Sequence, residues 1–354
     1  MTHSNIIRWG IAGTGQIAAQ FAGDIRHAPS AALAAVCSRD PARAAAFARS
    51  HGDIAPFGSL DDMIASGTID AVYLATPNMA HHAQALACIC AGMPVLIEKP
   101  MTASREEAVQ IRTAALEAGV FAMEALWSRY LPAVRAARQA LKNGVIGEII
   151  ALEADIAWPQ PYAPDSRFYD KAQGGGALHD LGIYGISLAR FLLGEATGAE
   201  GAWVRAASGV DISATLRLRF GHVEAAITCG FDRLGSNRLI VEGEKGVLVL
   251  GPPFIKAQAY GVYGSRRLAD LAQPGDGAGG RKLGKLLQHL PLPGTARQDF
   301  GFPGTGLQFE IEAASQAIRQ GLFEEPDNRL DDTIAALRII EQGLALPPSP
   351  GTAP

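Results

Sequence analysis

The chain has 354 residues, of which 48% are hydrophobic and 19% are charged, and its formal net charge is -4. This length exceeds what one hydrophobic core usually organises, so we expect two domains, and the composition excludes a disordered chain. The net charge offers no positive field for a phosphate backbone, and no apolar run reaches about 18 residues, so neither nucleic acid nor a membrane is an expected partner.

The cysteines and the N-terminal residues predict a reduced, cytoplasmic setting. Cys37, Cys88, Cys90 and Cys229 fit neither a disulfide framework nor a C-x-x-C metal pattern, so no metal is expected. The first ten residues lack the charged, apolar and cleavage-site regions of a secretory signal.

The first 125 residues alternate short apolar runs with alanine-rich stretches, which is typical of a parallel sheet with crossover helices. Strands are expected over residues 6–13, 31–39, 69–77, 93–100 and 120–126. Helices are expected over residues 16–28, 40–52, 81–92 and 104–119. We therefore predict an α/β, doubly wound Rossmann domain over residues 1–125.

The pattern changes after residue 126. A connecting helix is expected over 131–144, and runs with period-2 alternation predict strands over residues 148–158, 210–220, 222–231 and 238–251. Amphipathic helices are expected over 306–321 and 329–344. We predict an α+β substrate-binding and oligomerisation domain over residues 126–346, built on a large, mostly antiparallel sheet, with a tail over 347–354.

A glycine loop follows the first strand. In "GIAGTGQIA", Gly13 permits a tight turn, Gly15 lets the backbone approach a pyrophosphate, and Ala18 allows close helix–sheet packing. Gln16 and Ile17 open the next helix, whose free N–H groups favour phosphate. This motif, placed between a strand and a helix, predicts dinucleotide binding.

The end of the second strand indicates which dinucleotide binds. NAD enzymes usually carry an acid there for the ribose 2′-hydroxyl, whereas this chain has Ser38 and Arg39, with Arg43 one turn into the following helix. An arginine fork matches a 2′-phosphate, and Asp40 is expected to cap the helix instead. NADP(H) is therefore favoured over NAD(H). The alternative is that both arginines form a solvated face.

Two further loops, "ATPNMAHH" and "EKPM", follow the strands expected over residues 69–77 and 93–100, at the edge where doubly wound sheets bind ligands. Lys99 of the second loop is placed to hydrogen-bond a substrate hydroxyl and to lower the pKa of a neighbouring proton carrier. The alternative is a surface lysine paired with Glu98.

The stretch "GGGALHDLGIYG", residues 174–185, uses three glycines to bring a helix close to another surface. Asp180 and Tyr184 lie four residues apart on that helix. A tyrosine acts as a proton carrier near neutral pH when a cation stabilises its phenolate, and Lys99 is the candidate cation. The alternatives are that Asp180 is a first-turn acid and Tyr184 a core aromatic.

These motifs, in this order and spacing, resemble those of the glucose–fructose oxidoreductase / inositol dehydrogenase / rhizopine-catabolism (Gfo/Idh/MocA) family. "MEALWSRYLP" and the tyrosine of the D-x-x-x-[HY] motif look most like the subgroup of dimeric dihydrodiol dehydrogenases, NADP-dependent xylose dehydrogenases and glucose–fructose oxidoreductases. The resemblance covers nearly the whole chain.

The resemblance implies roles for individual residues. Lys99, Asp180 and Tyr184 would be catalytic, with Tyr184 as the general acid/base. The implied cofactor contacts are Gly13, Gly15, Gln16, Ile17, Ser38, Arg39, Arg43, Thr76, Pro77, Asn78, His81, Glu98 and Lys99. The implied substrate contacts are Trp127, Arg167 and His179. Family members pair their C-terminal sheets, which implies a homodimer or a larger homo-oligomer.

The sequence thus predicts an enzyme that transfers hydride between NADP(H) and a CH–OH or C=O carbon of a sugar, polyol or cyclic diol. The alternatives are an NAD-dependent cyclitol or nucleotide-sugar dehydrogenase and a non-catalytic cofactor-binding regulator on the same fold. A basic Gly- and Pro-rich segment over 264–294 is expected to be a loop or insertion that covers or alters the pocket. The sequence does not identify the substrate or the physiological direction.

Overall fold

The computed structural model describes residues 6–273 and 295–349, and the chain divides into two compact units. The first unit comprises residues 1–127 and 303–335, and the second comprises residues 128–302 and 336–354. The sequence predicts a second domain over residues 126–346, whereas Pro303–Ala335 groups with the first unit.

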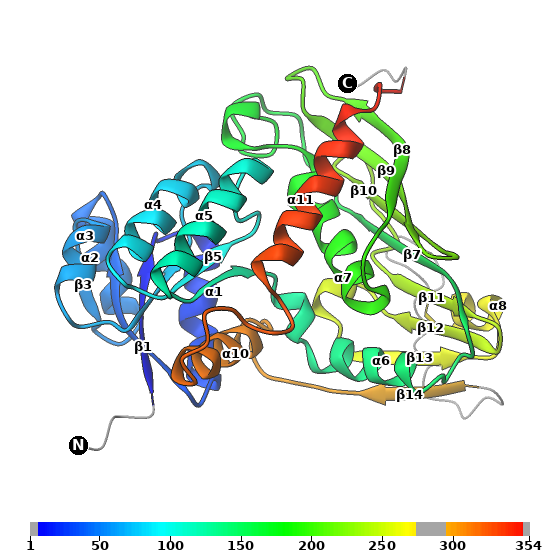
Figure 1. The fold of residues 1–354 in the computed structure, drawn as a ribbon, viewed down its shortest axis with the longest axis horizontal. Coiled ribbons are helices and arrows are strands. Elements are labelled where there is room, and N and C mark those ends of the chain that lie inside the picture. The colour runs from blue at the N-terminus through cyan, green and yellow to red at the C-terminus, as the bar shows by residue number, and fades with distance from the viewer. Residues whose placement is uncertain (1–5, 274–294, 350–354) are drawn as a thin grey trace. The chain divides into compact units, whose positions relative to one another are not determined.

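The first unit contains a six-stranded parallel sheet in the order β3-β2-β1-β4-β5-β6 (Figure 1). Its strands are β1 (Ile7–Ala12), β2 (Ala31–Cys37), β3 (Ala55–Phe57), β4 (Ala71–Leu74), β5 (Val95–Glu98) and β6 (Ala122–Ala125). Its crossover helices are α1 (Gln16–Asp24), α2 (Pro41–Ser50), α3 (Leu60–Ala65), α4 (Asn78–Cys90) and α5 (Arg105–Ala118). This order confirms the predicted doubly wound Rossmann sheet.

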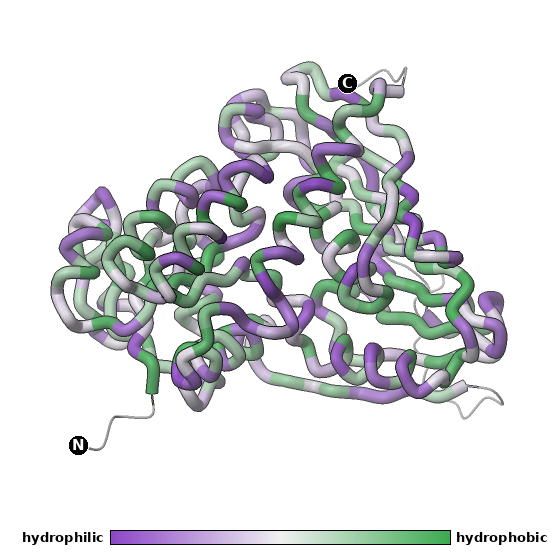
Figure 2. The backbone as a smooth tube through the Cα atoms, in the orientation of Figure 1, coloured by the Kyte–Doolittle hydropathy of each residue, from purple (hydrophilic) through white to green (hydrophobic). Residues whose placement is uncertain are grey.

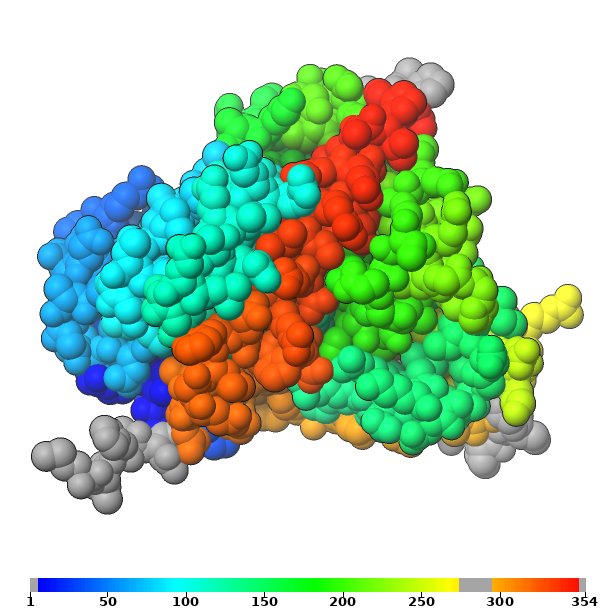
Figure 3. All heavy atoms as spheres, in the orientation of Figure 1, coloured from blue at the N-terminus to red at the C-terminus, as the bar shows by residue number. Residues whose placement is uncertain are grey.

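Helices cover both faces of this sheet because successive residues of a strand point to opposite sides. Trp9 packs edge-to-face on Phe21 of α1, while a Cβ at Gly10 would meet Met63 of α3. α4 and α5 lie side by side on the surface of this unit (Figure 3). β4 and β5 are buried along their whole length and read as apolar runs, as strands of sheets covered on both faces do.

The returning segment adds α10 (Gln308–Arg319) and the first part of α11 (Leu330–Ala345) to the first unit. Trp9 Nε1 donates to Ser315 Oγ of α10 at 2.9 Å, which places α10 on the same face as α1. Asp24, at the end of α1, accepts the backbone N–H groups of Thr305 and Leu307 at the start of α10. These buried contacts join segments nearly 300 residues apart.

The second unit contains an eight-stranded sheet in the order β14-β13-β12-β11-β7-β10-β9-β8. Its strands are β7 (Ile149–Ala157), β8 (Gly198–Arg205), β9 (Asp211–Phe220), β10 (Val223–Gly230), β11 (Leu239–Gly243), β12 (Gly246–Leu250), β13 (Ala259–Tyr263) and β14 (Thr295–Asp299). Only the β7–β10 pair is parallel among these described strands, which confirms the mostly antiparallel sheet. The region from β11 to β13 is largely apolar (Figure 2).

Three helices of the second unit are α6 (Pro132–Lys142), α7 (Ile183–Leu193) and α8 (Arg266–Ala272). α7 packs closely on the sheet because a Cβ at Gly185 would meet Ala154 of β7 at 3.3 Å. Ile240 of β11 faces the other way and packs with Ala269 and Ala272 of α8. Ile240 is paired in register with Glu153, the residue before Ala154, so α7 and α8 lie on opposite faces of the sheet.

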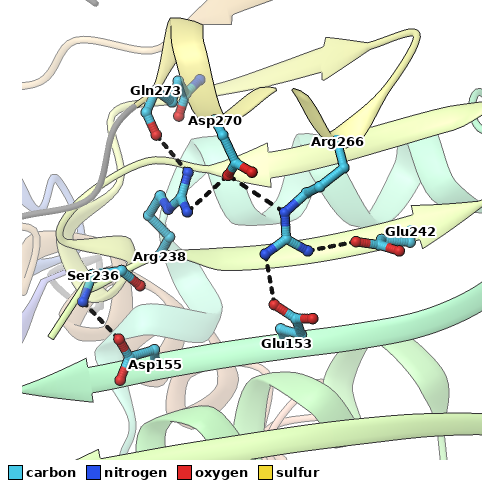
Figure 4. Close-up of polar contacts among 8 residues, drawn as sticks. All are labelled: Glu153, Asp155, Ser236, Arg238, Glu242, Arg266, Asp270 and Gln273. Carbon is cyan, nitrogen blue, oxygen red and sulfur yellow. Dashed lines mark hydrogen bonds and ion pairs between the residues drawn. The ribbon is translucent and has the colours of Figure 1, made fainter. Parts of the chain in front are cut away.

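Ion pairs fasten α8 to its face of the sheet (Figure 4). Arg266 contacts Glu153 of β7 at 2.7 Å, and its guanidinium also contacts Glu242 of β11. Arg238 contacts Asp270 at 3.0 Å and donates to the carbonyl of Gln273 at 2.6 Å. The described part of the 264–294 segment is therefore a short helix on the face opposite α7, and residues 274–294 lie outside the described residues.

Within the part of the chain that the structure describes, no helix combines the length and the apolar character needed to span a bilayer.

Candidate functional site

The predicted glycine loop lies where β1 ends. Gly13 donates its N–H to the carbonyl of Cys37 at the end of β2, at 2.9 Å, and adopts a φ of 114°. A Cβ at Gly13 would stand 2.6 Å from the carbonyl oxygen of Ala75, just after β4. The ends of β1, β2 and β4 therefore meet at Gly13, and only glycine fits there.

The N-termini of α1 and α4 differ from those of their neighbours. Side chains of Asp40, Ser59 and Ser104 cap α2, α3 and α5, whereas Gly15 and Pro77 precede α1 and α4 without any side-chain cap. A Cβ at Gly15 would meet no atom within 4 Å. The start of α1, with Gln16 and Ile17, thus has no side-chain cap and has open space beside Gly15, which fits a bound phosphate.

The residues after β2 lie at the same edge. Asp40 caps α2, as predicted, by accepting the N–H groups of Ala42 at 2.9 Å and Arg43 at 3.3 Å. Ser38 Oγ accepts the N–H of Asp40. Arg39 and Arg43 are exposed, and neither forms an ion pair with another described residue.

His81 connects the two loops that follow β4 and β5. Its ring is fully buried, with Nε2 2.8 Å from the carbonyl oxygen of Thr76 and Nδ1 3.1 Å from that of Pro100. Burial lowers the pKa of His81. The structure thus places His81 between the loops as a link, while Asn78 begins α4 and is partly exposed.

Glu98 fixes the start of the loop that carries Lys99. Its carboxylate accepts the backbone N–H of Lys99 at 3.0 Å and the hydroxyl of Tyr73. Glu98 is 8% exposed, and burial raises the pKa of its carboxyl group. Lys99 itself is partly exposed.

Two of the three glycines of "GGGALHDLGIYG", Gly175 and Gly176, make the close approach that the sequence suggests. A Cβ at Gly175 would stand 2.7–2.9 Å from the carbonyl oxygens of Phe168, Arg167 and Asp170. Gly176 has a φ of 122°, and a Cβ there would stand 2.2 Å from Asp211 Oδ1. The glycines let this loop and the Asp211 carboxylate pack against the entry to the helix.

Asp211, at the start of β9, holds that entry. Its Oδ2 accepts the N–H of Leu178 at 2.7 Å. Residues Leu178–Gly182 form a π-helical turn that contains Asp180, and α7 follows with Tyr184 as its second residue. π turns inside helices occur frequently at functional sites.

The predicted catalytic and substrate residues are divided between the units. Lys99 and Trp127 belong to the first unit, whereas Arg167, His179, Asp180 and Tyr184 belong to the second. Arg167 Nη1 lies 3.3 Å from Asp180 Oδ1, and the two side chains are 61% and 16% exposed. Tyr184 is 6% exposed and Trp127 is 5% exposed.

Sequence analysis missed two buried acids beside these groups. Glu124 is fully buried in β6, and Asp211 is 1% exposed. A charged residue inside the apolar run "FAMEAL" is a signal that could have identified Glu124 as a buried, hydrogen-bonded acid. No comparable signal marks Asp211, because its partner Leu178 is 33 residues away. Among the described residues, no three His, Cys, Asp or Glu side chains are grouped to hold a metal ion.

Asp211 gives the second unit a pH dependence. Burial raises the pKa of the Asp211 carboxyl group well above its ordinary value, to about 6. Because the folded-state pKa is raised, the stabilising contribution is complete below the unfolded pKa and is lost as pH rises through about 6. The loss amounts to about 3 kcal/mol.

Asp211→Asn keeps an acceptor for Leu178 N–H without a charge, so we expect this loss to disappear. Urea unfolding of both proteins at a series of pH values checks this. Between about pH 4 and pH 7, the unfolding free energy of the wild-type chain should fall relative to that of Asp211→Asn. If the unfolding free energies of the two proteins changed in parallel with pH, the raised pKa of Asp211 would be contradicted.

Comparison with known proteins agrees with this architecture. Residues 7–126 match the model described as "Oxidoreductase family, NAD-binding Rossmann fold", and residues 134–249 match the "GFO/IDH/MocA C-terminal domain". The trans-1,2-dihydrobenzene-1,2-diol dehydrogenase of Bos taurus is 30% identical over 344 residues, which cover 95% of each chain.

Two solved structures share the fold. A 3-ketoreductase from Actinomadura kijaniata in complex with NADP and TDP-benzene has a TM-score of 0.77 at 23% identity, covering 95% of this chain and 96% of that one. The WlbA dehydrogenase from Bordetella pertussis, in complex with NADH and UDP-GlcNAcA, has a TM-score of 0.75 at 22% identity, covering 97% and 96%. The chain belongs to the Gfo/Idh/MocA family and is an oxidoreductase.

Proposed function

We propose that the protein is an NADP(H)-dependent oxidoreductase acting between a CH–OH and a C=O carbon of a cyclic diol, sugar or polyol. The observation that carries the cofactor assignment is the pair of exposed arginines after β2, Arg39 and Arg43. The nearby acid, Asp40, is engaged as the cap of α2. A 2′-phosphate would therefore meet two cations and no competing carboxylate.

The remaining cofactor contacts follow from the edge of the first sheet. The uncapped start of α1 after Gly15 fits the pyrophosphate, and the loops that His81 joins fit the ribose and nicotinamide. When bound, the nicotinamide supplies or accepts the hydride. The proposed contacts are Gly13, Gly15, Gln16, Ile17, Ser38, Arg39, Arg43, Thr76, Pro77, Asn78, His81, Glu98 and Lys99.

In the proposed mechanism, Tyr184 takes the proton from the substrate hydroxyl during oxidation and returns it during reduction. Lys99 lowers the pKa of the Tyr184 phenol by stabilising its anion. Asp180 orients Lys99 or the substrate hydroxyl. Trp127, Arg167 and His179 are the proposed substrate contacts, and the Arg167–Asp180 ion pair supports placing Arg167 near the reacting group.

The substrate class is supported by the relatives' names. The Bos taurus relative is named for a cyclic trans-diol, which favours a diol as the first substrate to test. The alternative of an NAD-dependent nucleotide-sugar dehydrogenase has support in the fold of the WlbA dehydrogenase, which binds NADH and a nucleotide sugar. The regulator alternative predicts cofactor binding without turnover. A homodimer or larger homo-oligomer in the cytoplasm stays a prediction, which light scattering and cell fractionation would check.

A fluorescence titration with NADPH and NADH tests the cofactor assignment. We expect tighter binding of NADPH, and Arg39→Ala should weaken NADPH binding by about tenfold to a hundredfold while leaving NADH nearly unchanged. Arg49→Ala, in the last turn of the same helix α2, is the matched control and should change neither affinity. Equal binding of both nucleotides, indifferent to Arg39, would favour the NAD-dependent alternative.

A further inference from the structure

In the loop that follows β5, buried side chains contact the backbone polar groups of Lys99, Pro100 and Met101. The N–H of Lys99 donates to Glu98, and Pro100 has no N–H to satisfy. The carbonyl of Pro100 faces His81 Nδ1 at 3.1 Å, and the N–H of Met101 donates to Glu124 Oε1 at 2.8 Å. The polar groups on both sides of the Lys99–Pro100 peptide are thus paired with side chains that are less than a tenth exposed.

Glu124 is itself anchored from the other side. Its second carboxylate oxygen, Oε2, accepts the hydroxyl of Thr333 on α11 at 2.8 Å. Its backbone carbonyl accepts the side-chain amide of Asn328 at 2.7 Å. Thr333 and Asn328 are each 1% exposed and belong to the returning segment of the first unit. These two hydrogen bonds tie the returning segment to β6.

We propose that Glu124 is a positioning residue that fixes the Lys99 loop. This inference rests on the proposed function, in which Lys99 acts on the reacting hydroxyl and the phenol of Tyr184. Without the Glu124 acceptor, the Met101 N–H would have to turn toward water or stay buried and unpaired, and either outcome moves the loop. A displacement of about 1 Å in a catalytic group can cost about a hundredfold in rate.

The competing explanation is that Glu124 merely fastens α11 to β6. Three variants separate the two roles. Glu124→Met preserves the side-chain volume and removes both acceptors, whereas Glu124→Gln keeps an acceptor for Met101 and offers an amide donor to the Thr333 hydroxyl. Thr333→Val removes only the bond to α11. Ser315→Ala is the control, because it removes other buried hydrogen bonds of the same unit, the one from Trp9 and the one to the carbonyl of Ile311.

The hydrogen bond from the Met101 N–H to Glu124 is called the clamp below. Hydrogen exchange measured residue by residue over 98–102, which needs no substrate, tests whether it forms. In the wild-type chain the Met101 amide should exchange as slowly as the amides of β6. Glu124→Met should speed its exchange at least tenfold, while Glu124→Gln, Thr333→Val and Ser315→Ala leave it close to wild type. Fast Met101 exchange in the wild-type chain would overturn the clamp even if Glu124→Met failed to fold. Equal acceleration in Thr333→Val and Ser315→Ala would reduce Glu124 to a structural role.

Turnover of a diol, aldose or polyol substrate tests whether Glu124 positions the Lys99 loop for catalysis. Glu124→Met should lower kcat about a hundredfold, and Glu124→Gln should restore kcat to within a few fold. Unchanged kcat in Glu124→Met despite accelerated Met101 exchange would overturn the positioning role of Glu124, whereas unchanged kcat in Lys99→Met would overturn the part that the proposed function assigns to Lys99. The two failures are thereby distinguished.

Discussion

Replacing Tyr184 with phenylalanine is expected to lower kcat by about a thousandfold, within the range that general acid–base groups contribute. The change removes only the phenolic oxygen, and Tyr184 is 6% exposed, so the packing of α7 should persist. Nucleotide affinity should remain within about threefold of wild type, because the proposed cofactor contacts lie on the first unit. Steady-state kinetics and fluorescence titration on the same preparations measure both quantities.

Tyr263→Phe is the matched control for that experiment. Tyr263 is also buried in the second unit and loses the same hydroxyl group, but it packs with α8 on the sheet face opposite α7. Its hydroxyl accepts a hydrogen bond from Gln273 at 2.9 Å, so the control costs some stability without a loss of turnover. Full activity in Tyr184→Phe would remove Tyr184 from the mechanism.

The second large effect is expected from Gly176→Ala. A Cβ at this position would stand 2.2 Å from Asp211 Oδ1, and the φ of 122° is itself strained for alanine. Asp211 would have to move away and leave the N–H of Leu178 without its acceptor. Together these effects should destabilise the second unit by about 3–5 kcal/mol and lower kcat by at least about a hundredfold, since Asp180 lies on the turn that Asp211 holds.

Gly209→Ala is the control that introduces backbone strain without bringing a Cβ close to another side chain. Gly209 has a φ of 92°, but a Cβ there would meet no atom within 4 Å. This control should cost about 1–2 kcal/mol and leave turnover unchanged. Denaturant unfolding and kinetics of the two variants give the comparison. Equal costs for both substitutions would show that the Asp211 contact has no energetic role.

Most of the Rossmann sheet could be predicted because its strands are buried apolar runs that end in recognisable loops. Three of the strands that were not predicted lack that signal, whereas β13, which was also not predicted, is a buried apolar run. β3 has three residues and includes Pro56, β8 carries Gly198 and Gly201 along a largely exposed edge, and β14 reads "TARQD" with no apolar alternation. Their pairing partners, rather than their own sequences, make them strands.

The positions of the site residues at strand ends could be predicted because the strands before them are recognisable apolar runs. Gly13, Ser38, Thr76 and Lys99 each follow a parallel strand, and such strands end at one edge of a sheet. The groups that hold these residues could not be predicted. Glu124 bonds Thr333 across 209 positions of sequence, and a single sequence contains no signal for such a contact. Which domain residues 303–335 would join is undetermined for the same reason.

The most direct test of the central claim is to incubate the protein with NADP+ and a panel of trans-diols, aldoses and polyols, following the absorbance of the reduced nicotinamide. We expect reduction with at least one member of the panel, and we expect both Lys99→Met and Tyr184→Phe to abolish it. Tight NADPH binding with no reduction by the wild-type protein across the panel would contradict the account and favour a cofactor-binding regulator.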